Sequence, residues 1–197
     1  MKQLLIGIVI LGAVILTAGC ATSKPRELTR EEWLTTTTRV YDGVEKERVI
    51  KAAERLFRLS DGDDFKIAHY EEGLYATRNW SVYVVLAASF GTDYWKLAVI
   101  PEKKGVKASI QVNTQSQAVS PMMVSGGAWT ATSMPMSGSP VMGTAIYDIF
   151  WSRMNYLLGL RQDWMTCQMA DERVKSGVTW GTNEALCNSF NVKDAVP

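Results

Sequence analysis

The segment YWKLAVIPEKKGVKASIQV, from Tyr94 to Val112, decides the fold, because apolar and polar residues alternate on both sides of its central turn. Before the turn, the apolar residues that share one face are Trp95, Leu97 and Val99, and after it they are Val106, Ala108, Ile110 and Val112. The sequence between them, Glu102-Lys103-Lys104-Gly105, is typical of a hairpin turn. Alternation with a period of two predicts two antiparallel strands with one face against a core.

The residues before this hairpin predict more strands. Residues 65–70 and 74–80 flank the turn Glu71-Glu72-Gly73 and alternate in the same way, with Leu74, Ala76, Arg78 and Trp80 on one face. Residues 35–41 are rich in β-branched side chains and predict another strand. Residues 81–90 are mostly apolar without a clear period, so they fit either a helix or a buried strand.

Residues 46–58 predict an amphipathic helix. Its apolar stripe, spaced three and four residues apart, consists of Val49, Ala52, Ala53, Leu56 and Phe57. Charged residues cover the other side, and Ser60-Asp61-Gly62 ends the helix. One such helix can cover one face of an antiparallel sheet. We therefore expect residues 35–112 to form an α+β domain, an antiparallel sheet packed by one amphipathic helix.

Residues 113–143 differ from the rest of the chain, because they contain no charged residue and are rich in Ser, Gly, Pro and Met. This composition predicts a long flexible loop, which is functional or disordered when it interrupts a compact domain. A C-terminal helix over about residues 144–161 follows, with a broad apolar face. We expect residues 144–197, this helix and the tail after it, to pack on the same domain.

The N-terminus predicts export and lipid attachment. Lys2 precedes an uncharged apolar run, residues 4–16, which has the length of a signal-peptide core and is short for a membrane span. The run ends in Leu16-Thr17-Ala18-Gly19-Cys20, which resembles the lipobox of bacterial lipoproteins. The resemblance implies that residues 1–19 are a cleaved signal peptide and that residues 20–34 are the lipidated Cys20 and a tether. An uncleaved transmembrane helix is the alternative.

The residue after Cys20 bears on the membrane that receives the protein. In enterobacteria-like sorting an Asp there retains a lipoprotein at the inner membrane, so Ala21 favours the outer membrane, facing the periplasm, in a Gram-negative host. The other two cysteines, Cys167 and Cys187, are an even pair in an oxidising compartment and predict a disulfide that clips the C-terminal tail. A metal or redox pair is the alternative, although the spacing is not Cys-x-x-Cys.

Two short stretches, Arg39-Val40-Tyr41-Asp42-Gly43-Val44 and Val49-Ile50-Lys51-Ala52-Ala53, precede the predicted strands. Together with those strands they resemble the unit of small envelope lipoproteins such as the BamC-type accessory lipoproteins of outer-membrane assembly. The resemblance spans residues 35–112 and implies a strand, a helix and an antiparallel sheet in a scaffold or accessory protein. The chain departs from that pattern by its single unit, its Ser- and Met-rich segment and its cysteine-bearing tail, and no binding residue is carried over.

No group of residues has the spacing of a catalytic site, so we expect neither an enzyme nor a cofactor. His69, the single histidine, has no obvious acidic or cysteine partner. A net charge of +1 gives no basic excess for nucleic acid. We expect a lipoprotein that is held to the membrane by Cys20 and serves structure, assembly or secretion by contacting other envelope proteins.

A periplasmic ligand- or copper-binding lipoprotein is the alternative. Thioethers are soft ligands that select Cu(I), and the uncharged segment contains Met122, Met123, Met134 and Met136. Against a copper site, the spacing of these methionines is irregular and no histidine or cysteine joins them. Methionine also forms adaptable apolar contact surfaces, which favours a partner-binding segment.

Overall fold

The computed structural model describes residues 26–61, 64–84, 87–123 and 129–187. Its elements, in chain order, are α2 (Arg30–Thr37), β1 (Thr38–Asp42), α3 (Lys46–Asp61), β2 (Phe65–Tyr70), β3 (Gly73–Val84), β4 (Ala87–Glu102), β5 (Gly105–Met123), β6 (Trp129–Pro140), α4 (Thr144–Leu157) and α5 (Cys167–Lys175). The expected signal peptide, residues 1–19, and the lipidated Cys20 lie outside the described residues.

The strands form one antiparallel sheet of six strands, and the α+β class is confirmed. The strand order is β1-β5-β4-β3-β2, and β6 pairs with the distal part of β5. The hairpin that decides the fold has the expected register, with Glu102 opposite Gly105 and Trp95 opposite Val112. Residues 81–90, which fitted either a helix or a strand, belong to the β3–β4 hairpin, in which Val84 pairs with Ala87.

Two helices, α3 and α4, pack against one face of the sheet; α3 is the expected amphipathic helix and α4 is the expected C-terminal helix. The apolar stripe of α3 is buried as predicted, and Val49, Leu56 and Phe57 are fully inaccessible to solvent. Helix α4 completes the core because its Phe150 ring lies between the two other layers, 6.0 Å from Phe57 on α3 and 5.7 Å from Trp95 on β4, as measured between ring centroids. The sheet is therefore covered by a layer of two helices that lie far apart in the sequence.

The N-terminal strand begins later than expected, since residues 35–37 end helix α2. Thr29 and Glu32 form a reciprocal capping box at the start of α2. Among the β-branched residues at its end, Thr36 and Thr37 donate their hydroxyl hydrogens to the carbonyls of Glu32 and Trp33, at 2.8 and 2.9 Å. The two hydroxyls are thereby satisfied within the helix.

The expectation of a flexible loop over residues 113–143 is wrong for most of its length. Residues 113–123 continue strand β5 and residues 129–140 form β6, paired from Asn113 opposite Pro140 to Met123 opposite Trp129. Residues 124–128 lie outside the described part. Prolines in this stretch lie where a strand has a partner on one side only. Pro121 follows the last β4 pair at Val119, and Pro135 lies on β6, whose only described partner is β5.

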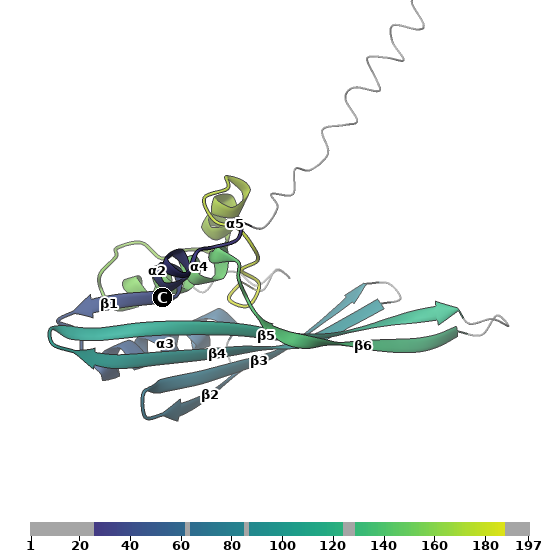
Figure 1. Cartoon of the computed structure of the whole chain (residues 1–197), viewed down its shortest axis with the longest axis horizontal. Coiled ribbons are helices and arrows are strands. Elements are labelled where there is room, and N and C mark those ends of the chain that lie inside the picture. The colour runs from purple at the N-terminus through teal and green to yellow at the C-terminus, as the bar shows by residue number, and fades with distance from the viewer. Residues whose placement is uncertain (1–25, 62–63, 85–86, 124–128, 188–197) are drawn as a thin grey trace, which may run out of the picture.

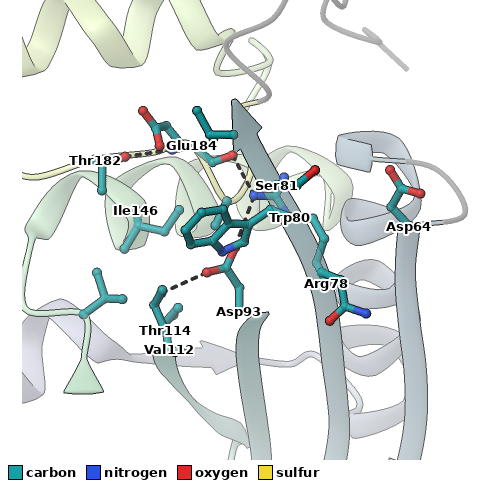
Figure 2. Close-up of a pocket in the computed structure, with 14 residues that line it drawn as sticks. Asp64, Arg78, Trp80, Ser81, Asp93, Val112, Thr114, Ile146, Thr182 and Glu184 are labelled. Carbon is teal, nitrogen blue, oxygen red and sulfur yellow. Dashed lines mark hydrogen bonds and ion pairs between the residues drawn. The ribbon is translucent and has the colours of Figure 1, made fainter. Parts of the chain in front are cut away.

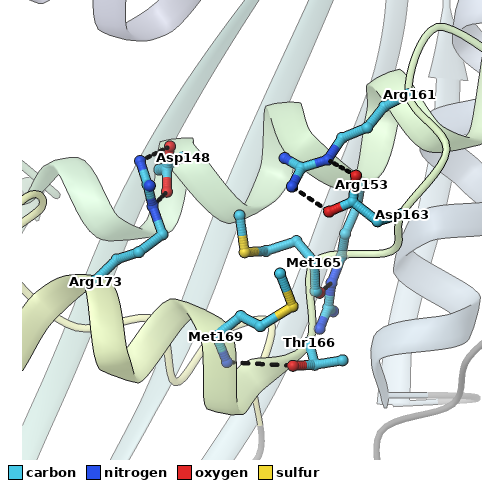
Figure 3. A network of polar contacts seen from close by, with 8 residues as sticks. All are labelled: Asp148, Arg153, Arg161, Asp163, Met165, Thr166, Met169 and Arg173. Atoms are coloured by element: carbon cyan, nitrogen blue, oxygen red, sulfur yellow. Dashed lines mark hydrogen bonds and ion pairs between the residues drawn. The ribbon is translucent and has the colours of Figure 1, made fainter.

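The C-terminal segment after α4, residues 158–187, is held against the helices by a disulfide and by hydrogen bonds. The predicted disulfide joins Cys167 and Cys187, whose Cα atoms are 5.6 Å apart. The fully buried Arg153 of α4 donates hydrogen bonds to the carbonyls of Met165 and Leu186, at 3.0 and 3.1 Å, on either side of that bridge. Figure 3 shows this arginine near Arg161 and Asp163, and it also shows the partly buried pair of Arg173 and Asp148, which joins α5 to α4. The tail therefore has a defined path and forms one wall of a cavity.

Candidate functional site

The first candidate site is a cavity of about 480 Å³ on the helix-covered side of the sheet, called here the inner pocket. Its walls come from strands β3, β4 and β5, from the start of α4 and from residues 182–185 of the C-terminal segment (Figure 2). Apolar walls are provided by Trp80, Val112 and Ile146, and polar ones by Asp93, Thr114 and Glu184. A cavity of this size and mixed lining is within the range of small-molecule sites.

A buried ion pair, Arg78 with Asp93, lies in the wall of the inner pocket. The Arg78 Nη2 atom is 3.1 Å from Asp93 Oδ2, and both side chains are less than a tenth exposed. Thr114 donates its hydroxyl hydrogen to the other Asp93 oxygen at 2.9 Å, and Arg78 Nη2 also donates to the Glu184 carbonyl at 3.1 Å. These partners join β3, β4, β5 and the C-terminal segment. Because buried charges need such compensation, the pair holds the pocket together.

Trp80 closes the inner pocket toward the end of the sheet, and its place depends on a glycine. Trp80 lies directly opposite Gly91 on the neighbouring strand β4. A Cβ atom on Gly91 would come within 2.3 Å of the Trp80 indole, closer than any real contact. The indole therefore rests on bare backbone, and any side chain at position 91 would displace it.

The second candidate site is the part of the sheet that extends beyond the helices, called here the projecting sheet. It consists of residues 79–84, 87–92, 113–123 and 129–140, the distal parts of β3, β4, β5 and β6 (Figure 1). None of the side chains that the structure describes in these ranges is buried. The strands remain paired across the projecting sheet, from Asn79 opposite Thr92 to Ala88 opposite Val119.

The projecting sheet carries no charge. Asp, Glu, Lys, Arg and His are absent from residues 79–92 as well as from residues 113–143. Exposed aromatic residues lie on it instead: Tyr83 is 72% exposed, Phe90 is 39% exposed, and their rings meet edge to face at 5.7 Å. The sequence analysis noted the absence of charged residues only in residues 113–143. The same absence in residues 79–92 could have indicated that the two segments lie together in one sheet.

The residues singled out from the sequence are dispersed. His69 lies on β2, half exposed, with its Nε2 atom 3.3 Å from Glu54 Oε2 on α3, so it does have an acidic neighbour, although this is a surface pair. Met122 pairs with Thr130 and Met134 with Ala118, so these two methionines are four residues apart along the ladder, roughly 13 Å at strand spacing. This register argues against one copper ion that is shared by all four methionines.

The described residues contain neither a candidate metal-binding group nor a helix that could cross a membrane. No group of three or more His, Cys, Asp or Glu side chains in these ranges is placed to hold a metal ion. Within the same ranges, no helix is both long and apolar enough to cross a membrane.

No protein-family model, no curated protein and no solved structure matches this chain. The resemblances to the lipobox and to the BamC-type unit therefore remain predictions. The site has to be interpreted from its own geometry.

Proposed function

We propose that this protein is a non-enzymatic lipoprotein of the outer membrane that faces the periplasm and binds other envelope proteins through its projecting sheet. The observation that carries the proposal is the projecting sheet itself, four paired strands that bury no described side chain and carry no charge. Protein interfaces are depleted of charged residues at their centre and enriched in aromatic residues, as here with Tyr83 and Phe90.

The position of the projecting sheet also supports this role. The disulfide, the buried Arg153 and the two-helix layer stabilise the other end of the molecule. A rigid base that presents an extended, uncharged sheet is suited to assembly or scaffolding. A tether on Cys20 would hold that base at the membrane surface, where partners in the envelope are within reach.

Shortening the β5–β6 hairpin tests the proposal. Residues 117–135 are replaced by Asn-Gly, which closes a two-residue turn between the paired residues Ser116 and Met136. In membranes treated with a crosslinker, we expect the wild-type lipoprotein to retain specific envelope proteins and the shortened variant to lose them. Gln111→Lys is the control, since it adds charge to an exposed position outside the projecting sheet. Equal retention by both variants would contradict the proposal.

The anchor has its own test. Radiolabelled palmitate should be incorporated into the wild-type protein and not into Cys20→Ser. Ala21→Asp should move the protein from outer-membrane to inner-membrane fractions of a Gram-negative host. Palmitate-free wild-type protein, or an unprocessed N-terminus, would instead indicate the uncleaved transmembrane helix.

A small-ligand carrier is the second candidate, and the inner pocket is the observation that favours it. Its apolar walls and its few polar groups suit a ligand that is mainly apolar. Ile146→Trp would place an indole in the cavity while leaving Arg78 and Asp93 themselves unchanged. A fluorescent apolar probe that binds the wild-type protein and is excluded by this variant would favour the carrier function over the scaffold function.

A further inference from the structure

The projecting sheet has two strand edges with no partner in the described part of the chain. Strand β3 pairs with β2 only as far as Arg78, so residues 79–84 have a free edge. Strand β6 pairs only with β5, so residues 129–140 have a free edge on the opposite side of the sheet. Free edges display backbone N–H and C=O groups and are templates for another strand.

These two edges lack the protection that the other edges of the sheet possess. The outer strand β1 is only five residues long and includes Arg39 and Asp42. The outer strand β2 includes Lys66 and His69, and His69 pairs with Glu54. Charges and short length are the usual means by which proteins prevent edge-to-edge association. Residues 79–84 and 129–134 have neither a charge nor a proline, whereas the rest of the β6 edge, residues 135–140, includes Pro135 and Pro140, so the unprotected part of β6 is residues 129–134. The unprotected edges are thus confined to the projecting sheet.

The direction of the strands makes the two free edges complementary to each other. All four strands of the projecting sheet are antiparallel to their neighbours, so β3 and β6, the first and fourth, run in opposite directions. When β6 of one copy lies beside β3 of the next, the new pair is antiparallel and continues the sheet. Each added copy again exposes one free β3 and one free β6, which is a head-to-tail interface.

We propose that the projecting sheet pairs edge to edge with a second copy of this chain, β6 of one copy against residues 79–84 of the next. The inference rests on the proposed function and specifies its partner. Both edges are neutral, so pairing of copies involves no repulsion between like charges. Attachment of each Cys20 to the same membrane would give all copies a common orientation and a high local concentration.

Cysteine crosslinking of the full-length lipidated protein in membranes tests the pairing. Ser81→Cys is combined in turn with Ala131→Cys, Thr132→Cys, Ser133→Cys and Met134→Cys, and the membranes are oxidised. We expect ladders of dimers, trimers and larger species, strongest at every second position, because alternate residues of a strand share a face. Ala68→Cys, exposed on β2, replaces Ser81→Cys as the control and should give no ladder.

A charged residue on the free edge of β6 provides a second test of the pairing. Ala131→Lys should reduce the crosslinked ladder at least tenfold, whereas Ala68→Lys should leave it unchanged. Formation of the Cys167–Cys187 bridge in both variants shows that they have folded. Ladders that persist undiminished in Ala131→Lys would overturn the proposal.

Three other outcomes would also overturn the pairing of β6 with β3. Dimers alone, formed as well by a single cysteine in β6, would indicate a two-fold contact between β6 strands. Crosslinking no stronger than in the Ala68→Cys control would mean that the copies do not pair. A photoreactive residue at position 131 that labels lipid and no protein would mean that the projecting sheet contacts the bilayer, and this result would contradict the proposed function as well. Labelling of a different envelope protein there would overturn the self-pairing while the proposed function stands.

Discussion

Single buried side chains hold the described structure together at points that are remote in the sequence. Arg153 is the clearest case, because its guanidinium reaches Ser60 on α3, Met165 before α5 and Leu186 beside the disulfide. It also stacks on Trp164, with its Cζ atom 4.7 Å from the ring centroid. A planar group with several donors is needed to contact all of these partners at once.

Replacement of Arg153 by lysine should therefore be costly although it conserves the charge. Lysine cannot reproduce the hydrogen-bond geometry, and buried carbonyls lose their donors, so we expect a loss of about 2–4 kcal/mol in the free energy of unfolding. Arg161→Lys is the matched control. Its pair with Asp163 lies at the surface, so the loss there should be below about 1 kcal/mol. Urea unfolding of the chain from Ala21 onward measures both, and similar losses would refute the central role of Arg153.

Two buried tyrosines predict the response to alkaline pH. Burial raises the pKa of Tyr41 and of Tyr147 well above the usual tyrosine value, so the folded state keeps both hydroxyls protonated. In the unfolded chain they ionise near pH 10. Their contribution to stability is complete below about pH 10 and is lost progressively as the pH rises beyond it. A double Tyr41→Phe, Tyr147→Phe variant should show a shallower decline of its unfolding temperature above pH 10. An identical decline would indicate that other groups control alkaline unfolding.

At the scale of elements, the ends of helices and strands depend on local hydrogen bonds and on neighbouring strands. Helix α2 extends through three threonines, residues 35–37, and the hydroxyls of Thr36 and Thr37 bond back to the preceding turn. Strands β5 and β6 tolerate prolines because those residues lie where one side is unpaired. The C-terminal segment, which buries Trp164, Met165 and Leu186, is also held in place by the disulfide and by Arg153.

Removal of that disulfide should destabilise the protein measurably. The bridge closes a loop of 20 residues, and the chain-entropy relation gives a loss of about 3 kcal/mol for Cys167→Ala with Cys187→Ala. Thermal unfolding of the chain from Ala21 onward checks the value. Reducing agent should bring the wild-type unfolding temperature down to that of the double variant and leave the variant unaffected. A wild-type protein that is insensitive to reductant would contradict the expected role of the bridge.

At the scale of the whole molecule, the proposed function separates stability from partner contact, with the buried core at one end of the sheet and the projecting sheet at the other. The shortened hairpin, in which Asn-Gly replaces residues 117–135, should lose less than about 1 kcal/mol of unfolding free energy, because Gln117 and Val119, the two side chains that the structure describes in that range, are not buried. Leu97→Ala, inside the core, should lose about 2–5 kcal/mol. Urea unfolding compares the two. A large loss in the shortened hairpin would show that the projecting sheet supports the fold.

The core and half of the sheet were predictable from the sequence. Alternation around Trp95 and Val106 predicted two strands and their buried face, and the stripe through Val49 and Leu56 predicted α3. Alternation along residues 74–80 also placed Arg78 and Trp80 on the same face as Leu74 and Ala76. Asp93, Ile146 and Glu184, the remaining main walls of the inner pocket, were not predicted as a site because they lie on elements that meet only through folding.

The sequence by itself determined the elements that bury a face, because burial imposes a period of two or of 3.6 on the apolar residues. It also predicted the disulfide, because Cys167 and Cys187 form an even pair once Cys20 is assigned to the expected lipid. Only the tertiary structure decided that residues 113–123 and 129–140 are strands. The side chains that the structure describes in these two segments are not buried. Burial therefore imposes no period of two on their apolar residues. Their backbone hydrogen bonds depend on pairing within the sheet, to β4 and to each other, which composition does not encode.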